Sequence, residues 1–296
     1  MEKKSILITG ASGFTGSYVV RAAVRSGLHC IAIARDKSNI ATDVHENIIA
    51  PLEDRSAVMA AVNAAQPDYV IHLAAISFVA HPSNAEIYKA NLIGTVNLLD
   101  ALKTAIKVPE RVVIASSANV YGQAEQLPIT ESTPLRPSNH YGMSKYFVER
   151  AAALYAELPV SICRPFNYTG CGQSASFVVP KLVDAYKRGY KEVVLGDIEV
   201  ERDFSDVRDV AAAYMLLLEA DTGAYNIASG RPISLSKVLE LLGSISEHQV
   251  VVKQDPKLFR QGEIRVSYGC TRLLEENAGY CRRYSFEDTL EWMLNA

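Results

Sequence analysis

Short apolar segments rich in β-branched residues alternate with helical segments along the first 165 residues of the chain. We expect strands at 5–9, 29–34, 69–73, 111–115 and 160–163, and helices at 14–26, 54–65, 83–106 and 140–157. Helices of this length between consecutive strands are typical of crossover connections, so the strands should lie parallel in one sheet covered on both faces. The alternation therefore predicts a doubly wound α/β fold.

The second part of the chain has a looser pattern, because prolines and glycines become frequent after Arg164. A helix at 206–219 and a strand at 224–228 return to the earlier style, followed by short helices at 235–243, 271–276 and 286–294 and one short strand at 249–252. No Pro- or Ser-rich linker separates the two parts. At roughly 150 residues per domain, we expect a first domain at 1–165 and a smaller mixed α/β region at 166–296, with 206–228 packing back on the first.

The charge balance and the cysteines exclude several classes of protein. Thirty Lys and Arg against 33 Asp and Glu give a net charge of −3, which does not favour nucleic-acid or membrane binding. The longest apolar run, 210–218, is far below the ~20 residues of a membrane span, and the N-terminal apolar segment is too short for a signal peptide. The cysteines form no C-x-x-C pair and no zinc-ligand spacing: Cys30, Cys163, Cys171, Cys270 and Cys281. We expect a soluble cytoplasmic protein without a metal site.

A glycine-rich loop lies between the first expected strand and the first expected helix. Its glycines are three residues apart in the segment Gly10, Ala11, Ser12, Gly13, Phe14, Thr15, Gly16. Gly10 permits a tight turn, Gly13 lets the backbone approach a pyrophosphate, and Gly16 allows close packing of helix on strand. The free N–H groups of the helix N-terminus would bind the phosphates. The order of strand, loop and helix favours a dinucleotide site over a purely structural turn.

The end of the second strand bears on which dinucleotide binds. An NAD site usually has Asp or Glu there, whereas this chain has Ala34-Arg35. The Arg35 guanidinium suits a 2′-phosphate, which favours NADP(H) over NAD(H), although a surface arginine partly neutralised by Asp36 is the alternative. Asp54 begins the helix after the third strand, where it would either accept a hydrogen bond from adenine or simply cap the helix.

A tyrosine and a lysine four residues apart form the second candidate site. Tyr141 and Lys145 should project from one face of a helix, and a nearby ammonium favours a tyrosine phenolate. Ser117 follows the strand at 111–115, at the sheet edge where parallel α/β folds bind ligands. Its hydroxyl would hold a substrate oxygen beside the tyrosine, or else be an ordinary turn serine.

These segments together resemble one family. The motifs T-G-A-S-G-F-T-G (9–16), H-L-A-A (72–75), S-S-A-N-V-Y-G (116–122), Y-G-M-S-K (141–145) and R-P-F-N (164–167) are similar to those of the nucleotide-sugar branch of the extended short-chain dehydrogenase/reductases. The resemblance implies a Rossmann-like fold and a catalytic triad of Ser117, Tyr141 and Lys145. It also implies that Lys145 holds the nicotinamide ribose and that three residues of the second motif line the cofactor: Leu73, Ala74 and Ala75.

The resemblance continues through 164–173, 177–181, 196–209 and 255–263, which are similar to GDP-mannose 4,6-dehydratases and GDP-4-keto-6-deoxy-D-mannose reductases. It implies that residues 1–165 bind NADP(H) and that 166–296 bind a nucleotide sugar. The matching sugar-nucleotide contacts are Asn167, Lys181, Arg202, Arg260 and Glu263. Arginines can pair with a diphosphate and a glutamate can accept from ribose hydroxyls, although any single one could equally be a surface ion-pair residue. The resemblance further implies a homodimer formed through the helices at 83–106 and 140–157.

One departure from the family bears on the reaction. The dehydratases carry an acidic residue just after the Ser/Thr position, whereas this chain has Ala118 and Asn119, neither of which is a general acid or base at neutral pH. We therefore expect no dehydration. The favoured hypothesis is NADPH-dependent reduction of the 4-keto group of a GDP-4-keto-6-deoxy-hexose of the mannose type. The alternatives are an NAD(P)-dependent 4-epimerase and a non-catalytic NADP(H) sensor.

Overall fold

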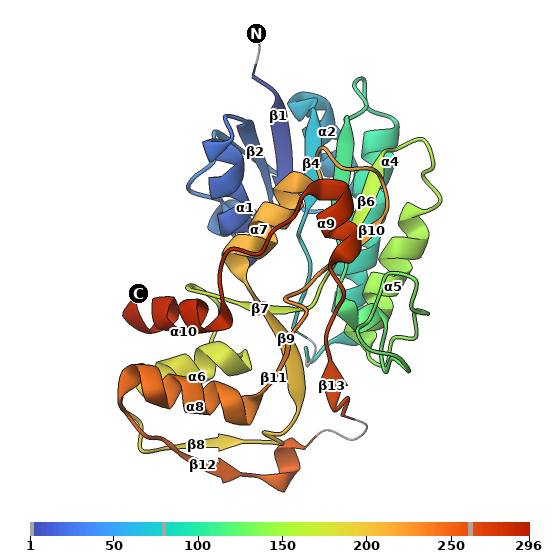
Figure 1. Cartoon of the computed structure of the whole chain (residues 1–296). Coiled ribbons are helices and arrows are strands. Elements are labelled where there is room, and N and C mark those ends of the chain that lie inside the picture. The colour runs from blue at the N-terminus through green and yellow to red at the C-terminus, as the bar shows by residue number, and fades with distance from the viewer. Residues whose placement is uncertain (1–2, 79–80, 260–262) are drawn as a thin grey trace.

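The computed structural model describes residues 3–78, 81–259 and 263–296, and its main layer is a seven-stranded sheet (Figure 1). Every neighbouring pair in this sheet is parallel. The strand order is β10-β6-β5-β4-β1-β2-β3. In chain order the strands are β1 (Ser5–Thr9), β2 (His29–Ala34), β3 (Glu46–Ile49), β4 (Tyr69–His72), β5 (Arg111–Ala115), β6 (Val160–Pro165) and β10 (Ala224–Ile227). The doubly wound prediction is confirmed, and the order reverses between β1 and β4, where such folds bind ligands.

Helices cover both faces of this sheet, as the alternation of side chains requires. Ile6 and Ile8 of β1 belong to one apolar core, and Leu7 belongs to the other. Because successive strand residues point to opposite faces, β1 is buried on both sides. One face carries α1 (Phe14–Arg25), α7 (Val207–Leu216) and α9 (Arg272–Ala278), and the other carries α2 (Arg55–Ala65), α4 (Gly94–Lys103) and α5 (His140–Ala152).

Part of this first layer comes from the second half of the chain. The strand β10 pairs with β6 at the sheet edge, and α7 packs on α1. Three side chains in and just after α7, Val210, Tyr214 and Leu217, are buried in the same core as Ile6 and Ile8. The chain therefore returns to its first layer after entering the smaller second region, as Figure 1 shows.

The second region has a core of its own, between helices and short strands below the sheet in Figure 1. Its helices are α6 (Val178–Lys187), α8 (Leu235–Ser246) and α10 (Phe286–Asn295). Its strands are β7 (Asn167–Thr169), β8 (Glu192–Leu195), β9 (Glu201–Asp206), β11 (Pro232–Ser234), β12 (Val251–Gln254) and β13 (Val266–Ser267). Of these strands, the sequence predicted only one, near β12, so the expected mixed α/β character is present but with more strands than the sequence indicated. The other strands span six residues or fewer and pair with distant segments, which leaves little local periodicity.

Two long helices differ in detail from the sequence prediction. The helix expected at 83–106 consists of α3 (Asn84–Tyr88), a π-helical turn at Lys89–Ile93, and α4, and it ends at Lys103. The helix expected at 140–157 ends at Ala152, and the residues after it form turns that lead to β6. No helix in the described ranges is long and apolar enough to cross a membrane.

Candidate active site

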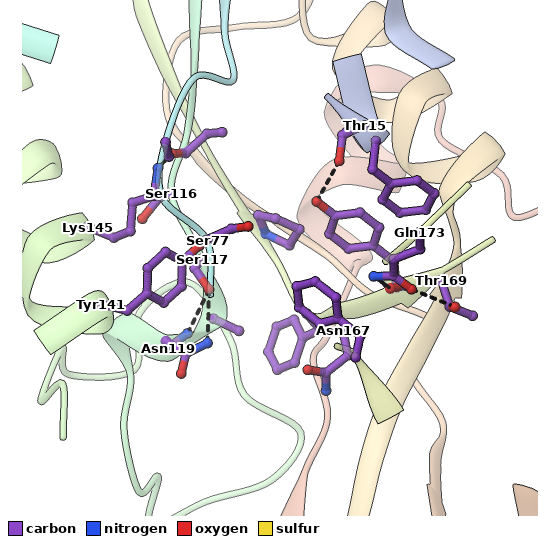
Figure 2. Close-up of a pocket in the computed structure, with 18 of the residues that line it drawn as sticks. Thr15, Ser77, Ser116, Ser117, Asn119, Tyr141, Lys145, Asn167, Thr169 and Gln173 are labelled. Atoms are coloured by element: carbon purple, nitrogen blue, oxygen red, sulfur yellow. Dashed lines mark hydrogen bonds between the residues drawn. The ribbon is translucent and has the colours of Figure 1, made fainter. Parts of the chain in front are cut away.

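A cavity of about 680 Å³ opens at the carboxyl ends of the central strands, between the first layer and the second region. Its wall includes the loops after β1, β4 and β5, the start of α5, and residues of β7 and α6. Figure 2 shows Ser117, Tyr141 and Lys145 on one wall, with Thr15, Thr169 and Gln173 on the opposite wall. A cavity of this size suits a small molecule or a cofactor with its substrate.

The glycine loop has the close contacts that only glycine allows. Gly10 has φ +70°, and a Cβ there would lie 2.7 Å from the backbone nitrogen of Ala74. A Cβ on Gly16 would lie 2.0 Å from the carbonyl oxygen of Gly10. Gly13 is the N-cap of α1 and has no side chain to occupy the helix N-terminus. The loop therefore leaves an open cradle of backbone at the cavity, which fits the pyrophosphate of a dinucleotide.

Most of the expected cofactor residues line the cavity. They are Gly10, Gly13, Phe14, Thr15, Gly16, Leu73, Ala74, Ala75, Tyr141 and Lys145. Ser12 lies instead on a smaller adjoining hollow with Ile40 and Asp43. Arg35 follows β2 with a side chain that is 68% exposed, and its Nε lies 3.4 Å from Asp36. Asp54 caps α2 by accepting hydrogen bonds from the amides of Ser56 and Ala57, the second of the two roles that the sequence left open.

Ser117 lies just beyond β5 and caps the short turn Ala118–Val120. Its Oγ accepts hydrogen bonds from the Asn119 backbone N–H at 3.2 Å and from the Asn119 side-chain amide at 3.1 Å. Tyr141 points toward Ser117 from the first turn of α5 (Figure 2). The Ser117 and Tyr141 hydroxyls are thus brought together at the cavity wall.

The electrostatics of Tyr141 and Lys145 are governed by burial. Tyr141 is 8% exposed and Lys145 is 4% exposed. Desolvation raises the pKa of Tyr141 well above its usual value, with the Ser117 hydroxyl opposing this, and lowers the pKa of Lys145 to about 8. The Lys145 ammonium donates to the carbonyl of Ala115 at 2.7 Å. The sequence predicted that Lys145 would lower the pKa of Tyr141, but in this structure desolvation raises that pKa, and the group that lowers it is the Ser117 hydroxyl rather than Lys145.

The expected substrate residues divide into three groups. Asn167, Arg202 and Glu263 line the cavity, and the Arg202 guanidinium pairs with Glu263 at 2.5 Å. Lys181 does not line it, since its ammonium donates to the Val194 carbonyl of β8 at 3.0 Å. Arg260 lies outside the described residues.

A buried polar network behind the cavity wall was missed by the sequence analysis. Arg164 forms a two-pronged pair with Glu149, with nitrogen–oxygen distances of 3.0 and 2.7 Å, and Ser116 donates to the same carboxylate at 2.5 Å. A third Arg164 nitrogen donates to the Tyr121 hydroxyl at 3.0 Å. Glu149 lies four residues after Lys145 on α5, a spacing that could have drawn attention to it.

An aromatic cluster joins the glycine loop to the second region. Tyr168 of β7 stacks on Phe14 with ring centroids 6.1 Å apart, and its hydroxyl is 2.8 Å from the Thr15 hydroxyl. Tyr18 of α1 contacts Phe14 and, on its other side, Trp292 of α10. Direct side-chain contacts therefore hold the glycine loop against the second region along one wall of the cavity.

A family model described as GDP-mannose 4,6 dehydratase matches residues 7–293. The chain belongs to this family. Membership confirms the expected place in the nucleotide-sugar branch of the extended short-chain dehydrogenase/reductases.

Individual relatives narrow the range of chemistry. A GDP-6-deoxy-D-talose 4-dehydrogenase of Aggregatibacter actinomycetemcomitans is 33% identical over 264 residues, covering 88% of this chain and 86% of the relative. A GDP-6-deoxy-D-mannose reductase of Pseudomonas aeruginosa is 35% identical over 243 residues, covering 77% and 80%. The solved structure of RMD from Pseudomonas aeruginosa complexed with NADPH is 29% identical, with a TM-score of 0.85 over 99% of this chain and 98% of that one. Other matching structures are UDP-glucose 4-epimerases, some with NAD.

Proposed function

We propose that this chain catalyses the NADPH-dependent reduction of the 4-keto group of a GDP-4-keto-6-deoxy-hexose of the mannose type. The product is GDP-rhamnose or its C4 epimer GDP-6-deoxytalose, depending on the face of C4 that receives hydride. Support comes from the two relatives that act, by name, on GDP-6-deoxy sugars.

The observation that carries this proposal is the placement of the Tyr141 hydroxyl beside the Ser117 hydroxyl at the cavity wall. Burial raises the pKa of Tyr141 above its usual value, which is already high enough to keep a tyrosine protonated near pH 7. A protonated tyrosine can give a proton to a ketone oxygen as hydride arrives at the carbon. Tyr141 can therefore serve as the proton donor that a reduction requires.

Dehydration is disfavoured by the residues that follow Ser117. Ala118 has no polar side-chain atom, and the Asn119 amide cannot take a proton near pH 7. Asn119 is also engaged with Ser117 through its Nδ2. We propose that the chain lacks the acid–base group needed to expel water, in spite of its membership of a family named for dehydratases.

The residues at the cavity fit a nicotinamide dinucleotide. The N-terminus of α1 at Gly13, brought to the cavity by the tight packing at Gly10 and Gly16, would hold the pyrophosphate, and Lys145 would hold the nicotinamide ribose. Arg35 would pair with a 2′-phosphate. Its exposed guanidinium makes only a weak contact with Asp36, because the nitrogen–oxygen distance is as long as 3.4 Å. This is the basis for preferring NADP(H) over NAD(H).

The second region would bind the nucleotide sugar. Arg202 and Glu263 lie together at the cavity and supply a cation for a diphosphate and a carboxylate for ribose hydroxyls, and Asn167 supplies an amide. We propose the division at residue 165 on this basis, with 1–165 binding the cofactor and 166–296 the substrate. Lys181 contributes less directly, because its ammonium is bound to the Val194 carbonyl.

The residues act as follows in the proposed reaction. The cofactor, when bound, supplies hydride to C4 of the sugar. Tyr141 gives its proton to O4, so that the carbonyl becomes a hydroxyl and Tyr141 becomes a phenolate. Ser117 hydrogen-bonds O4 and stabilises the negative charge that develops there. The Lys145 ammonium, which shares the α5 face with Tyr141, stabilises the phenolate until solvent returns a proton.

The deciding experiment supplies GDP-4-keto-6-deoxy-D-mannose with NADPH or NADH, follows cofactor oxidation, and determines the C4 configuration of the product by NMR. We expect oxidation with NADPH above that with NADH. No oxidation with either cofactor would refute the reductase.

A second candidate is a nucleotide-sugar 4-epimerase, because UDP-glucose 4-epimerases are among the matching structures and use the same fold. An epimerase oxidises and re-reduces the same carbon, so it needs no added reductant. Interconversion of UDP-hexoses without net cofactor turnover would establish it in place of the reductase.

We also propose a cytoplasmic homodimer. Apolar side chains along α4 and α5 and next to them are exposed in the single chain, among them Ile93, Phe147 and Leu154. A bundle of these helices from two copies would cover them. Sedimentation at micromolar concentration tests this, and a monomer would contradict it.

A further inference from the structure

The Ser117 hydroxyl has both of its acceptor positions filled by one neighbour. Asn119 donates to Ser117 Oγ twice, from its backbone N–H at 3.2 Å and from its Nδ2 at 3.1 Å. A serine hydroxyl has two lone pairs and one proton. With both lone pairs engaged, Ser117 is left to donate its own proton, and the Ser117 side-chain hydrogen bond that opposes the rise in the pKa of Tyr141 is of this donating kind.

The orientation of the Asn119 amide is itself fixed. Its Oδ1 accepts from Nδ2 of Asn139 at 3.2 Å, and Oδ1 of Asn139 accepts from the Gly142 backbone N–H at 2.8 Å. Because Gly142 lies in the first turn of α5, this chain of bonds starts at the helix that carries Tyr141. An amide flip of Asn119 would place two donors against each other at Asn139, because Oδ1 of Asn139 is already held by the Gly142 N–H, so the contact to Asn139 selects the observed orientation.

The backbone ties the same two segments together. A Cβ on Gly142 would lie 2.5 Å from the carbonyl oxygen of Asn119, so the turn after Ser117 rests directly on the start of α5. The relative positions of the Ser117 and Tyr141 hydroxyls are thus set by contacts on either side of Asn119.

Building on the proposed function, we propose that Asn119 is a positioning residue that makes Ser117 a hydrogen-bond donor only. Ser117 and Tyr141 then both donate to one substrate oxygen. A carbonyl oxygen accepts two hydrogen bonds and carries no proton, whereas an alcohol also needs an acceptor for its own O–H. The site is therefore built to select a 4-keto sugar over the corresponding 4-hydroxy sugar.

The replacement Asn119→Asp tests this, because it keeps the shape of the side chain and exchanges the donor for an acceptor. The new carboxylate would draw the Ser117 proton toward itself, so that Ser117 presents lone pairs to the substrate. Since loss of one such donor costs about 10²–10³-fold in kcat, we expect kcat to fall by about 100-fold near neutral pH. Once protonated, the introduced carboxyl group can donate again, so the loss relative to wild type should shrink several-fold when the pH is lowered to about 5, toward the carboxyl pKa.

The matched control is Asn119→Ala. It removes the side-chain donor but leaves the backbone N–H bond and introduces no acceptor, so its loss should be about tenfold and independent of pH relative to wild type. A purely structural role predicts the opposite order, since the aspartate replacement preserves the contact to Asn139 and the alanine replacement does not. A milder loss in Asn119→Asp than in Asn119→Ala, or a ratio of Asn119→Asp to wild-type activity that stays constant across pH, would overturn the proposal.

A binding measurement separates this inference from the proposed reaction. Calorimetry gives the dissociation constants for GDP-4-keto-6-deoxy-D-mannose and for GDP-D-rhamnose, its 4-hydroxy counterpart, without turnover. We expect wild type to prefer the ketone by about five- to tenfold, as one matched hydrogen bond provides, and Asn119→Asp to lose that preference. If wild type shows the preference without reducing the sugar, the proposed reaction fails and the role of Asn119 stands. Equal preferences in wild type and variant refute the role of Asn119, and binding of neither sugar refutes both.

Discussion

Replacing Glu149 with alanine should destabilise the protein by about 3–5 kcal/mol, because the Arg164 guanidinium would stay buried without its counterion. Both side chains are only 7% exposed. The change removes two Arg164 bonds, at 3.0 and 2.7 Å, and the 2.5 Å bond from Ser116. The hydrogen bonds that remain to Arg164 go to the Tyr121 hydroxyl and to the backbone carbonyl of Glu131. Both oxygens are neutral, so they cannot neutralise the charge of Arg164.

The size of the effect follows from the burial of the pair. Losing one partner of a buried ion pair costs about 3–5 kcal/mol, whereas losing one partner of an exposed pair costs about 0–1 kcal/mol. At roughly 2 °C per kcal/mol for a chain of this length, the midpoint of thermal unfolding should fall by about 6–10 °C. A fall of that size is resolved easily by circular dichroism.

The assay is urea unfolding of wild type and variants, followed by circular dichroism. Asp184→Ala is the matched control, since Asp184 pairs with Arg188 at 2.7 Å on the exposed face of α6 and should cost under about 0.5 kcal/mol. The double replacement Glu149→Leu with Arg164→Met should recover most of the loss, because it leaves no buried charge. A loss of less than about 1 kcal/mol in the free energy of unfolding for Glu149→Ala, or equal losses for Glu149→Ala and Asp184→Ala, would refute the reasoning.

Three further changes probe the cavity. Tyr141→Phe removes the proton donor and should lower kcat by about 10²–10⁴-fold while the NADPH dissociation constant, measured by fluorescence, stays within about twofold; unchanged kcat would exclude the assigned role. Arg35→Ala should raise the KM for NADPH by about 10–100-fold and leave the KM for NADH unchanged, because it removes a charged hydrogen bond to the 2′-phosphate. A parallel rise of the KM for both cofactors would contradict this. Burial lowers the pKa of Lys145 to about 8, from 10.5 in the unfolded chain. Between these two pH values the unfolded state binds more protons than the folded state, so the free energy of unfolding should rise as the pH increases from about 8 to 10. Lys145→Met should lose that rise in urea titrations, and an identical pH dependence in both proteins would argue against the buried ammonium.

The first layer could be predicted from sequence because its signals are local. Each central strand is a short apolar run, and Gly10 and Gly16 mark the loop at which the first helix meets the first strand. The relation of Tyr141 to Lys145 is also local, since both lie on one helix. Six of the seven strands and the place of the cavity at the sheet edge followed from these patterns, whereas the edge strand β3, with the sequence ENII, was not predicted.

The rest depended on contacts between segments far apart in the chain. The strands β7 and β13 span three and two residues, and both pair with β9. Strands this short show no periodicity in the sequence from which they could be predicted. Lys181 follows Pro180, which lines the cavity, yet its side chain turns to a carbonyl of β8. From the sequence, Asn119 is known only as an amide near the position where the dehydratases have an acidic residue. Its hydrogen bonds to Ser117 and Asn139 depend on the packing of the turn after β5 against α5. The raised pKa of Tyr141 likewise follows from burial, which the spacing of residues does not report.

The return of α7 and β10 to the first layer has a consequence for how the protein is made. When only the first 165 residues have left the ribosome, β6 has an unpaired edge, and the face of α1 that will meet Val210, Tyr214 and Leu217 is bare. Unpaired strand edges and exposed apolar faces are the surfaces through which nascent chains associate wrongly. The first layer therefore stays vulnerable until translation has passed residue 227, and the contact of Trp292 with Tyr18 of α1 forms only once α10 has been made. Folding of the first layer and completion of the cavity wall thus both wait for segments synthesised later, such as β10 and Ser267.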